Sequence, residues 1–340
     1  MSARPEMTDS EVEELLGAYA LHACEPHEVA AIEAALARRP DLAREAERLA
    51  RAAAWIGATE ALDPPTTLRG DVMDLIGRRR AGERGDPALH LYRTQSERFA
   101  RAVEQVRAGS LDEITANGLS AHDLVVHEAA QESLLAQAID ASPVPEIDET
   151  GIEARTAAFV VYFDGRPLDD VLTAWRAAVD ANCAWADGAD ASTPAANWRG
   201  LALPPDDAIV VRAFETWIHT DDLRRVAGLP GEPPEPASLA LMSDLAGRTL
   251  GLALGLVDRT RAGKTARLVL TGDGGGEWLV AMDGTGPGRG TPDVTVTADA
   301  VDWCLLVGDR IAPGELAHTV EGDVSLADDL LTAAPALASL

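Results

Sequence analysis

Residues Phe214 to Arg225, FETWIHTDDLRR, place a glutamate and a histidine four positions apart, at Glu215 and His219. Four residues make a little over one turn of an α-helix, so both side chains point the same way, with their Cβ atoms about 5–6 Å apart. Such a pair can chelate a metal ion. A solvated salt bridge has the same spacing and is common on helices. Spacing alone therefore leaves both interpretations open.

A metal site would need a third ligand, and His127 is the best candidate among the seven histidines. Zinc in catalytic sites typically takes three protein ligands and keeps a fourth position open. His127 shares a helix face with Leu124 and Leu134, so we expect it to point inward. An inward-pointing imidazole must be satisfied by hydrogen bonds or by a metal. We expect His122, beside the start of the same helix, to face the solvent.

Two segments divide the chain around these residues. RRRAGERGDP, residues 78–87, is charged and contains glycine, and LPGEPPEPAS, residues 229–238, has four prolines that stop a helix and favour an extended connector. The predicted domains are therefore residues 1–77, 88–228 and 239–340.

The middle domain is predicted to be a four-helix bundle, because long segments carry apolar residues at helical spacing. Ser120 and Asp123 predict the start of the helix that carries His127. Gly228 suits the C-cap of the helix that carries Glu215 and His219. The bundle must bring these two helices together.

The other two domains have different patterns. Residues 1–77 predict a small module of three helices. Residues 239–340 predict a small α+β domain, with one helix followed by antiparallel strands with glycine turns and two more helices. The expected elements are helices at 10–21, 26–39, 41–62, 89–106, 119–139, 151–163, 168–186, 206–228 and 239–257, strands at 266–272, 277–284 and 293–299, and helices near 300–310 and 325–337. The protein is thus expected to be mainly α with a C-terminal α+β domain.

Composition limits the partners. The 340 residues carry a formal net charge of −27, and Lys264 is the only lysine. Phosphate backbones and anionic lipids would repel such a chain, so we expect no direct binding to nucleic acid or membranes. The most apolar helix, residues 239–257, contains Asp244 and Arg248, which favours a buried helix over a membrane span. Three cysteines without a CxxC motif and the lack of a signal-peptide pattern suit the cytoplasm.

Two motifs resemble the mycothiol-dependent maleylpyruvate isomerase family, a branch of the DinB-like bundles. NGLSAHDLVVH, Asn117 to His127, is similar to its first signature, and RAFETWIHTDDL, Arg212 to Leu223, to its second. VEGDVSLADDLL, Val320 to Leu331, also resembles the family's C-terminal domain, and the likeness spans about residues 89–335. Leu119 departs from the pattern, because the family usually has tryptophan there.

This resemblance implies a divalent metal, usually zinc, held by His127, Glu215 and His219. It further implies that mycothiol or a similar small-molecule thiol binds at the open coordination position, where zinc lowers the thiol pKa. The thiolate would add to an alkene for isomerisation or displace a leaving group. Arg212 and Asp222 flank the ligands and are either second-shell or substrate-binding groups, or a surface ion pair. Cys183 is better explained as a core residue than as a nucleophile.

The N-terminal part resembles the zinc-binding anti-sigma domain. LLGAYALHACEPHEVAAIEAALARRPDLAREAERL, Leu15 to Leu49, contains the Gly-Ala-Tyr element of that family, and residues 62–76 resemble the segment that follows it. However, Ala35, Arg39 and Leu42 stand where its histidine and two cysteines would be. We therefore expect no zinc there, although the helices could still bind a sigma factor. Alternatively, they pack on the bundle or mediate homo-oligomerisation.

The two resemblances lead to two main hypotheses. In the first, the protein is a cytoplasmic anti-sigma-like regulator whose bundle senses a thiol or small electrophile and controls release of a sigma factor. In the second, it is a mycothiol-dependent isomerase or S-transferase. A third alternative is a bundle whose metal is structural.

Overall fold

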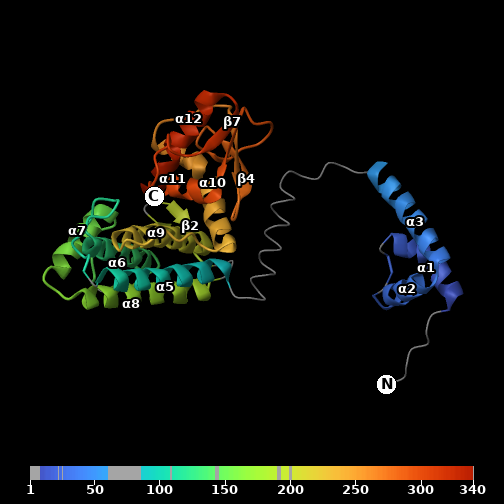
Figure 1. The fold of residues 1–340 in the computed structure, drawn as a ribbon, viewed down its shortest axis with the longest axis horizontal. Helices are drawn as coiled ribbons and strands as arrows, with labels where there is room; N and C mark the ends of the chain where they lie inside the picture. Colours follow the sequence, from blue (N-terminus) through green and yellow to red (C-terminus); the bar gives the residue numbers. More distant parts are fainter. Residues whose placement is uncertain are drawn as a thin grey trace, which may run out of the picture. The chain divides into compact units, whose positions relative to one another are not determined.

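The computed structural model describes residues 8–21, 23–24, 26–59, 86–107, 109–141, 145–189, 193–198 and 201–339. Contacts between residues divide the chain into two units, Met1–Gly77 and Arg78–Leu340 (Figure 1). The predicted linker at 78–87 lies outside the described residues except for its last two positions, and so does the segment at 62–76. The predicted three-domain boundaries stay a prediction.

The described residues of the first unit form three helices, as predicted. They are α1 (Asp9–Ala20), α2 (Pro26–Arg38) and α3 (Pro40–Thr59). Prolines open α2 and α3, where a missing N–H costs nothing. Ala35 and Leu42, at two of the positions where the anti-sigma family has zinc ligands, are buried in the apolar core of this unit with Val12, Leu16 and Ile32. Arg39, at the remaining position, pairs with Asp41. These side chains therefore stabilise the helices by packing and a surface ion pair.

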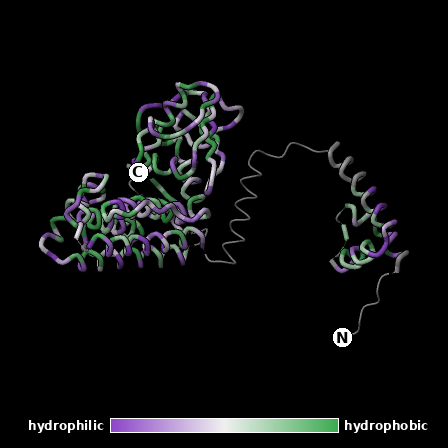
Figure 2. The backbone as a smooth tube through the Cα atoms, in the orientation of Figure 1, coloured by the Kyte–Doolittle hydropathy of each residue, from purple (hydrophilic) through white to green (hydrophobic). Residues whose placement is uncertain are grey.

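A four-helix bundle begins the second unit. Its helices are α5 (Pro87–Arg107), α6 (Ala121–Ala138), α8 (Leu168–Asp187) and α9 (Pro205–Val226), and α7 (Ile152–Phe163) packs on α6. α5 lies along α9 and α6 along α8. Green apolar and purple polar segments alternate along these helices in Figure 2, as expected for helices that bury one face. The long helices predicted for residues 88–228 are all present.

Local signals fix the ends of the two helices that carry the candidate ligands. The Ser120 hydroxyl accepts a hydrogen bond from the backbone N–H of Asp123 at the start of α6. At the end of α9, Gly228 has φ +71°, and the N–H groups of Gly228 and Leu229 donate to the carbonyls of Arg225 and Arg224. This is the Schellman arrangement that glycine permits. The predicted start of α6 and the predicted glycine cap of α9 are therefore confirmed, but the capping box expected from Ser120 and Asp123 is only half formed, through the Ser120 hydroxyl.

The rest of the second unit is a mixed sheet with helices. The strand order is β5-β4-β3-β6-β7. The elements are β3 (Thr265–Thr271), β4 (Gly276–Ala281), β5 (Gly286–Pro287), β6 (Val294–Asp299), β7 (His318–Gly322), α10 (Pro236–Leu256), α11 (Ala300–Val307), α12 (Val324–Ala333) and the 3-10 helix η1 (Ala334–Ser339). Two short strands, β1 (Ala196–Trp198) and β2 (Leu201–Leu203), form a separate hairpin.

The prediction of a purely antiparallel sheet is wrong. β3 and β4 are antiparallel, but β6 runs parallel to β3. The two-residue strand β5 pairs near the C-terminal end of β4, opposite the start of β3. From there a short connection passes the end of β4 and the start of β3. β6 then runs parallel to β3 on its other side. β7, which the sequence did not predict, is an exposed edge strand paired with β6.

α10 is the one helix among the described residues that is long and apolar enough to cross a membrane. In the structure 56% of its most apolar 18-residue stretch is buried. The helix packs against β4, α9 and α11. Figure 1 shows α10 beside both the bundle and the sheet. The buried helix predicted at residues 239–257 is thus present, but it begins earlier, because Pro236 occupies its first turn.

The proline-rich connector between α9 and α10 is held by side chains. Glu232 receives hydrogen bonds from Arg98 of α5, and its backbone N–H donates to Asp221 of α9 at 3.0 Å. Arg224 donates to the carbonyl of Pro230 at 3.0 Å and pairs with Glu232 at 3.1 Å. The connector is therefore fastened to the bundle at several points.

Candidate metal centre

Glu215 and His219 lie together on α9, away from bulk solvent. The Glu215 side chain is 22% exposed and that of His219 is 5% exposed. The distance from Glu215 Oε2 to His219 Nε2 is 3.5 Å. In a tetrahedral zinc site with metal–ligand distances of about 2.0–2.2 Å, neighbouring donor atoms are about 3.3–3.6 Å apart. The spacing of these two donor atoms therefore fits a shared metal ion.

The two ring nitrogens of His219 have different surroundings. Nδ1 is 3.5 Å from Asp222 Oδ2. Nε2 is buried and has no hydrogen-bond partner among the described residues. Buried polar atoms are normally paired, because leaving one unpaired costs about 1–3 kcal/mol. An Nδ1–H directed at Asp222 would leave the Nε2 lone pair available to a metal.

His127 reaches the same place from α6. Its ring packs edge-on against that of His219, with centroids 5.2 Å apart. Nδ1 is 2.9 Å from the Thr156 hydroxyl and Nε2 is 3.2 Å from the Gln131 side-chain nitrogen. If Nδ1 donates to Thr156, Nε2 again carries the lone pair. Burial, followed by the charge of His219, holds the pKa of His127 well below its ordinary value, so the ring is neutral at pH 7, as a metal ligand must be.

The three predicted ligands therefore lie near one another, with His219 in contact with both others, but they do not converge as a complete set of metal ligands. In the described part of the chain, no three His, Cys, Asp or Glu side chains converge as a metal cluster. The donor set still fits a divalent cation, since it offers two imidazoles, with an unpaired Nε2 on His219, and one carboxylate. Burial raises the pKa of Glu215, whereas His219 and Arg212 oppose this rise. A cation would favour the ionised carboxylate.

Asp222 links His219 to the C-terminal part of the second unit. Its carboxylate is buried and accepts hydrogen bonds from Arg310 Nε at 2.8 Å and Arg310 Nη2 at 2.6 Å. Burial raises the pKa of Asp222, but the hydrogen bonds from His219 and Arg310 outweigh it, so the pKa is lowered and the carboxylate stays charged. The alternative prediction, that Arg212 and Asp222 form a surface ion pair, is therefore wrong, because both are buried and Asp222 pairs with Arg310. Asp222 lies where a second-shell carboxylate would orient His219.

We predict that Asp222→Asn weakens zinc binding by about 10–100-fold, because the amide cannot hold the His219 ring as the carboxylate does. Zinc titration by calorimetry measures this. Asp221→Asn is the matched control, since Asp221 is also buried on α9 but bonds the connector at Glu232. Equal zinc affinity in the Asp222 variant and the unmodified protein would show that Asp222 does not support a metal ligand.

Arg212 has a different environment from the one expected. It is fully buried and donates to Glu128 at 3.1 Å and to Glu132 at 3.2 and 3.1 Å. Tyr92 donates to Glu132, and Asn182 also bonds this carboxylate. Burial raises the pKa of Glu132, although Arg212 opposes it. Arg212 is thus the cation of a buried network in the bundle, next to the candidate ligands.

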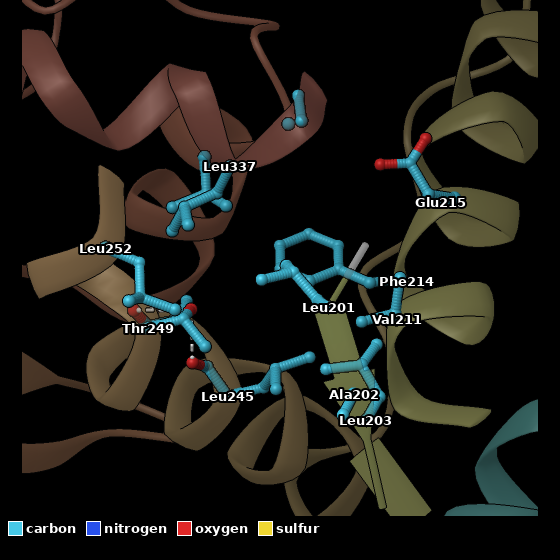
Figure 3. Close-up of a pocket in the computed structure, with 14 residues that line it drawn as sticks. Leu201, Ala202, Leu203, Val211, Phe214, Glu215, Leu245, Thr249, Leu252 and Leu337 are labelled. Carbon is cyan, nitrogen blue, oxygen red and sulfur yellow. Dashed lines mark hydrogen bonds between the residues drawn. The ribbon is translucent and has the colours of Figure 1, made fainter. Parts of the chain in front are cut away.

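An apolar cavity of about 170 Å³ adjoins Glu215. Its walls come from β2, α9, α10, the end of α11 and η1. In Figure 3 the Glu215 carboxylate extends from α9 toward the part of the cavity that carries Leu337. No local pattern predicts this cavity, because its lining comes from elements far apart in the chain.

The cysteines do not take part in the site. Cys183 and Cys304 are buried, and burial raises the pKa of both thiols, that of Cys304 to about 12. A thiol that stays protonated is a poor nucleophile and a poor ligand. Cys183 is therefore a core residue, as predicted.

These features define a helix bundle with candidate metal ligands on two packed helices and an attached α+β part. Residues 92–224 match the model of the mycothiol maleylpyruvate isomerase N-terminal domain family. The match includes His127, Glu215 and His219, whereas residues 1–77 and the C-terminal part lie outside it. Leu119, which departs from the family pattern, is half-buried against the bundle core.

Two solved structures are similar to the chain. Both are crystal structures of the mycothiol-dependent maleylpyruvate isomerase, one of them a histidine-to-alanine mutant. Each is 16% identical, covers 68% of this chain and 91% of its own, and has a TM-score of 0.48. No curated protein shows a significant match.

Proposed function

We propose that residues 86–340 form a metal-dependent enzyme that acts with a small thiol, mycothiol or a close analogue. His127, Glu215 and His219 would hold one divalent cation, zinc being the best fit to two imidazoles and a carboxylate. The observation that carries the proposal is the buried, unpaired Nε2 of His219, 3.5 Å from Glu215 Oε2. The family match over residues 92–224 supports the thiol.

The bound cation would supply a lowered thiol pKa, so that the thiolate is available at neutral pH. The surrounding residues prepare this chemistry. Thr156 and Asp222 orient the two imidazoles through their Nδ1 atoms. The apolar cavity beside Glu215 keeps water from the reacting carbon. The thiolate would add to an activated alkene, which permits cis/trans isomerisation, or displace a leaving group as an S-transferase.

The test is thiol-dependent turnover by the full-length protein. With zinc and mycothiol, we expect isomerisation of an activated alkene, or consumption of an electrophile, monitored by absorbance. Chelation of the metal, and His127→Ala, should each abolish the activity. His122→Ala should retain it, because His122 pairs with Asp123 at the start of α6, apart from the three ligands. Turnover that survives chelation would contradict the proposal.

The anti-sigma interpretation becomes secondary. The family match over residues 92–224 favours the enzyme, and no comparison shows the resemblance of residues 1–77 to anti-sigma domains. A sigma-factor partner for α1 to α3, a homo-oligomer and a cytoplasmic location remain predictions. A pull-down of sigma factors by the full-length chain, with and without mycothiol, tests the partner.

A further inference from the structure

The cavity beside Glu215 has an unusual charge for a site expected to receive an anionic substrate. Of the described residues that line it, Glu215 is the one that carries a charge, and the others are apolar side chains, Gly308 and Thr249. The Thr249 hydroxyl already donates to the carbonyl of Leu245 at 2.7 Å. The lining side chains therefore offer no cation and no uncommitted donor to a carboxylate.

Among the described residues, Arg310 does not change this conclusion. Arg310 follows the lining residue Gly308 by two positions, but its guanidinium donates to Asp222 and to the carbonyl of Gly308. A divalent cation at the candidate centre would bring two positive charges, which the Glu215 carboxylate and one thiolate neutralise. A second substrate with carboxylates would then lose its hydration without gaining an ion pair.

The size of the cavity limits the substrate further. A cavity of about 150 Å³ lined by leucine, isoleucine and phenylalanine holds benzene. At about 170 Å³, the cavity here takes a group of similar size, such as a substituted benzene ring or a short branched alkyl chain. Figure 3 shows Phe214, Leu245 and Leu252 facing this space.

We infer that the second substrate of this site is an uncharged, largely apolar electrophile and not a dicarboxylate such as maleylpyruvate. The inference rests on the proposed thiol-dependent function. In the simplest case the thiol sulfur forms a bond to an aryl carbon and the carbon–chlorine bond breaks. Chloride leaves with the bonding electrons, and the thiol proton goes to the solvent. No oxidant or reductant is required.

A binding experiment on the full-length protein without metal tests the cavity alone. Ethylbenzene and phenylacetate have similar sizes and differ in charge, and ligand-observed NMR measures both. We expect ethylbenzene to bind about tenfold or more tightly than phenylacetate, because the carboxylate would be desolvated beside Glu215. Equal affinities, or a preference for phenylacetate, would overturn the inference.

Two variants one turn apart on α10 locate the binding. Leu252 lines the cavity and is 39% exposed, whereas Leu256 is 55% exposed and does not line it. Leu252→Arg adds a cation at the cavity and should reduce the preference for ethylbenzene by about tenfold. Leu256→Arg should leave the preference unchanged. Equal effects of the two substitutions would place the binding elsewhere.

A reaction experiment separates this inference from the proposed function. The zinc-loaded protein and mycothiol are supplied with 2-chloro-1,3-dinitrobenzene or with its carboxylated analogue 4-chloro-3,5-dinitrobenzoate, and thioether formation is followed by absorbance. We expect a higher kcat/KM for the uncharged compound. A higher value for the carboxylate would overturn the substrate class but support the thiol chemistry. Failure to bind zinc would refute the proposed function, while the NMR result would still decide what the cavity binds.

Discussion

Replacing His219 by alanine is expected to reduce zinc affinity by more than about 100-fold, the upper end of what loss of a second-shell partner costs. His219 supplies the buried Nε2 that has no partner among the described residues, and its Nδ1 faces Asp222. Alanine removes the donor atom and leaves Glu215 and His127 on different helices without the residue that contacts both. Metal analysis after dialysis should fall from about one zinc per chain to almost none.

His122→Ala is the control for this experiment. It removes a histidine from α6, the helix of His127, but one that pairs with Asp123 near the helix start. Its zinc content should equal that of the unmodified protein. If His219→Ala kept the same zinc content and affinity as His122→Ala, the three residues would not be the metal site.

Arg212→Met should destabilise the second unit by about 3–5 kcal/mol, because it leaves two buried glutamates without their cation. Arg212, Glu128 and Glu132 have fully buried side chains. The raised pKa of Glu132 lets this residue take up a proton and lessen the cost, but Glu128 would still be desolvated. For a unit of this size the expected fall in melting temperature is about 6–20 °C. Tryptophan fluorescence reports this unit, since six of the seven tryptophans lie in it.

Two further variants test whether the unpaired charge causes the loss of stability in Arg212→Met. Arg101→Met removes an exposed arginine of α5, 63% exposed and 3.9 Å from Glu97, and should change stability by less than about 0.5 kcal/mol. Adding Glu128→Gln and Glu132→Gln to Arg212→Met removes the uncompensated charge and should recover part of the loss. If the triple variant were no more stable than Arg212→Met alone, lost packing and not charge would explain the effect.

The helices could be predicted because their signals are local. Ser120 marked the start of α6, Gly228 the end of α9 and Pro26 the start of α2, each within a residue or two. The start of α10 at Pro236 was missed, because this proline was assigned to the connector. Strand direction could not be predicted in the same way. β6 is parallel to β3 because of where the short strand β5 ends, and nothing in the residues of β6 itself encodes that. β7 is an exposed edge strand without alternating burial, so its residues show no alternation of apolar and polar side chains that would predict a strand.

The candidate site was only partly predictable for a similar reason. Glu215 and His219 share a helix turn, so their proximity follows from the sequence alone. His127 lies on α6, so it comes near these two residues only if α6 packs against α9. The resemblance to the isomerase family supplied that pairing. Arg310 could not be found, because it is 88 residues from Asp222 and lies in a different part of the fold. The burial of Arg212 depends on Glu128 and Glu132 of α6, which the motif on α9 does not contain.

The fastened connector has a consequence for how a ligand enters. Glu232 and Pro230 are bonded to Arg98, Asp221 and Arg224, so the segment between α9 and α10 is not a hinge. Those two helices form facing walls of the apolar cavity. We therefore expect the distance between these walls to change little on binding, so that the group entering the cavity is selected by its fit to walls already in place.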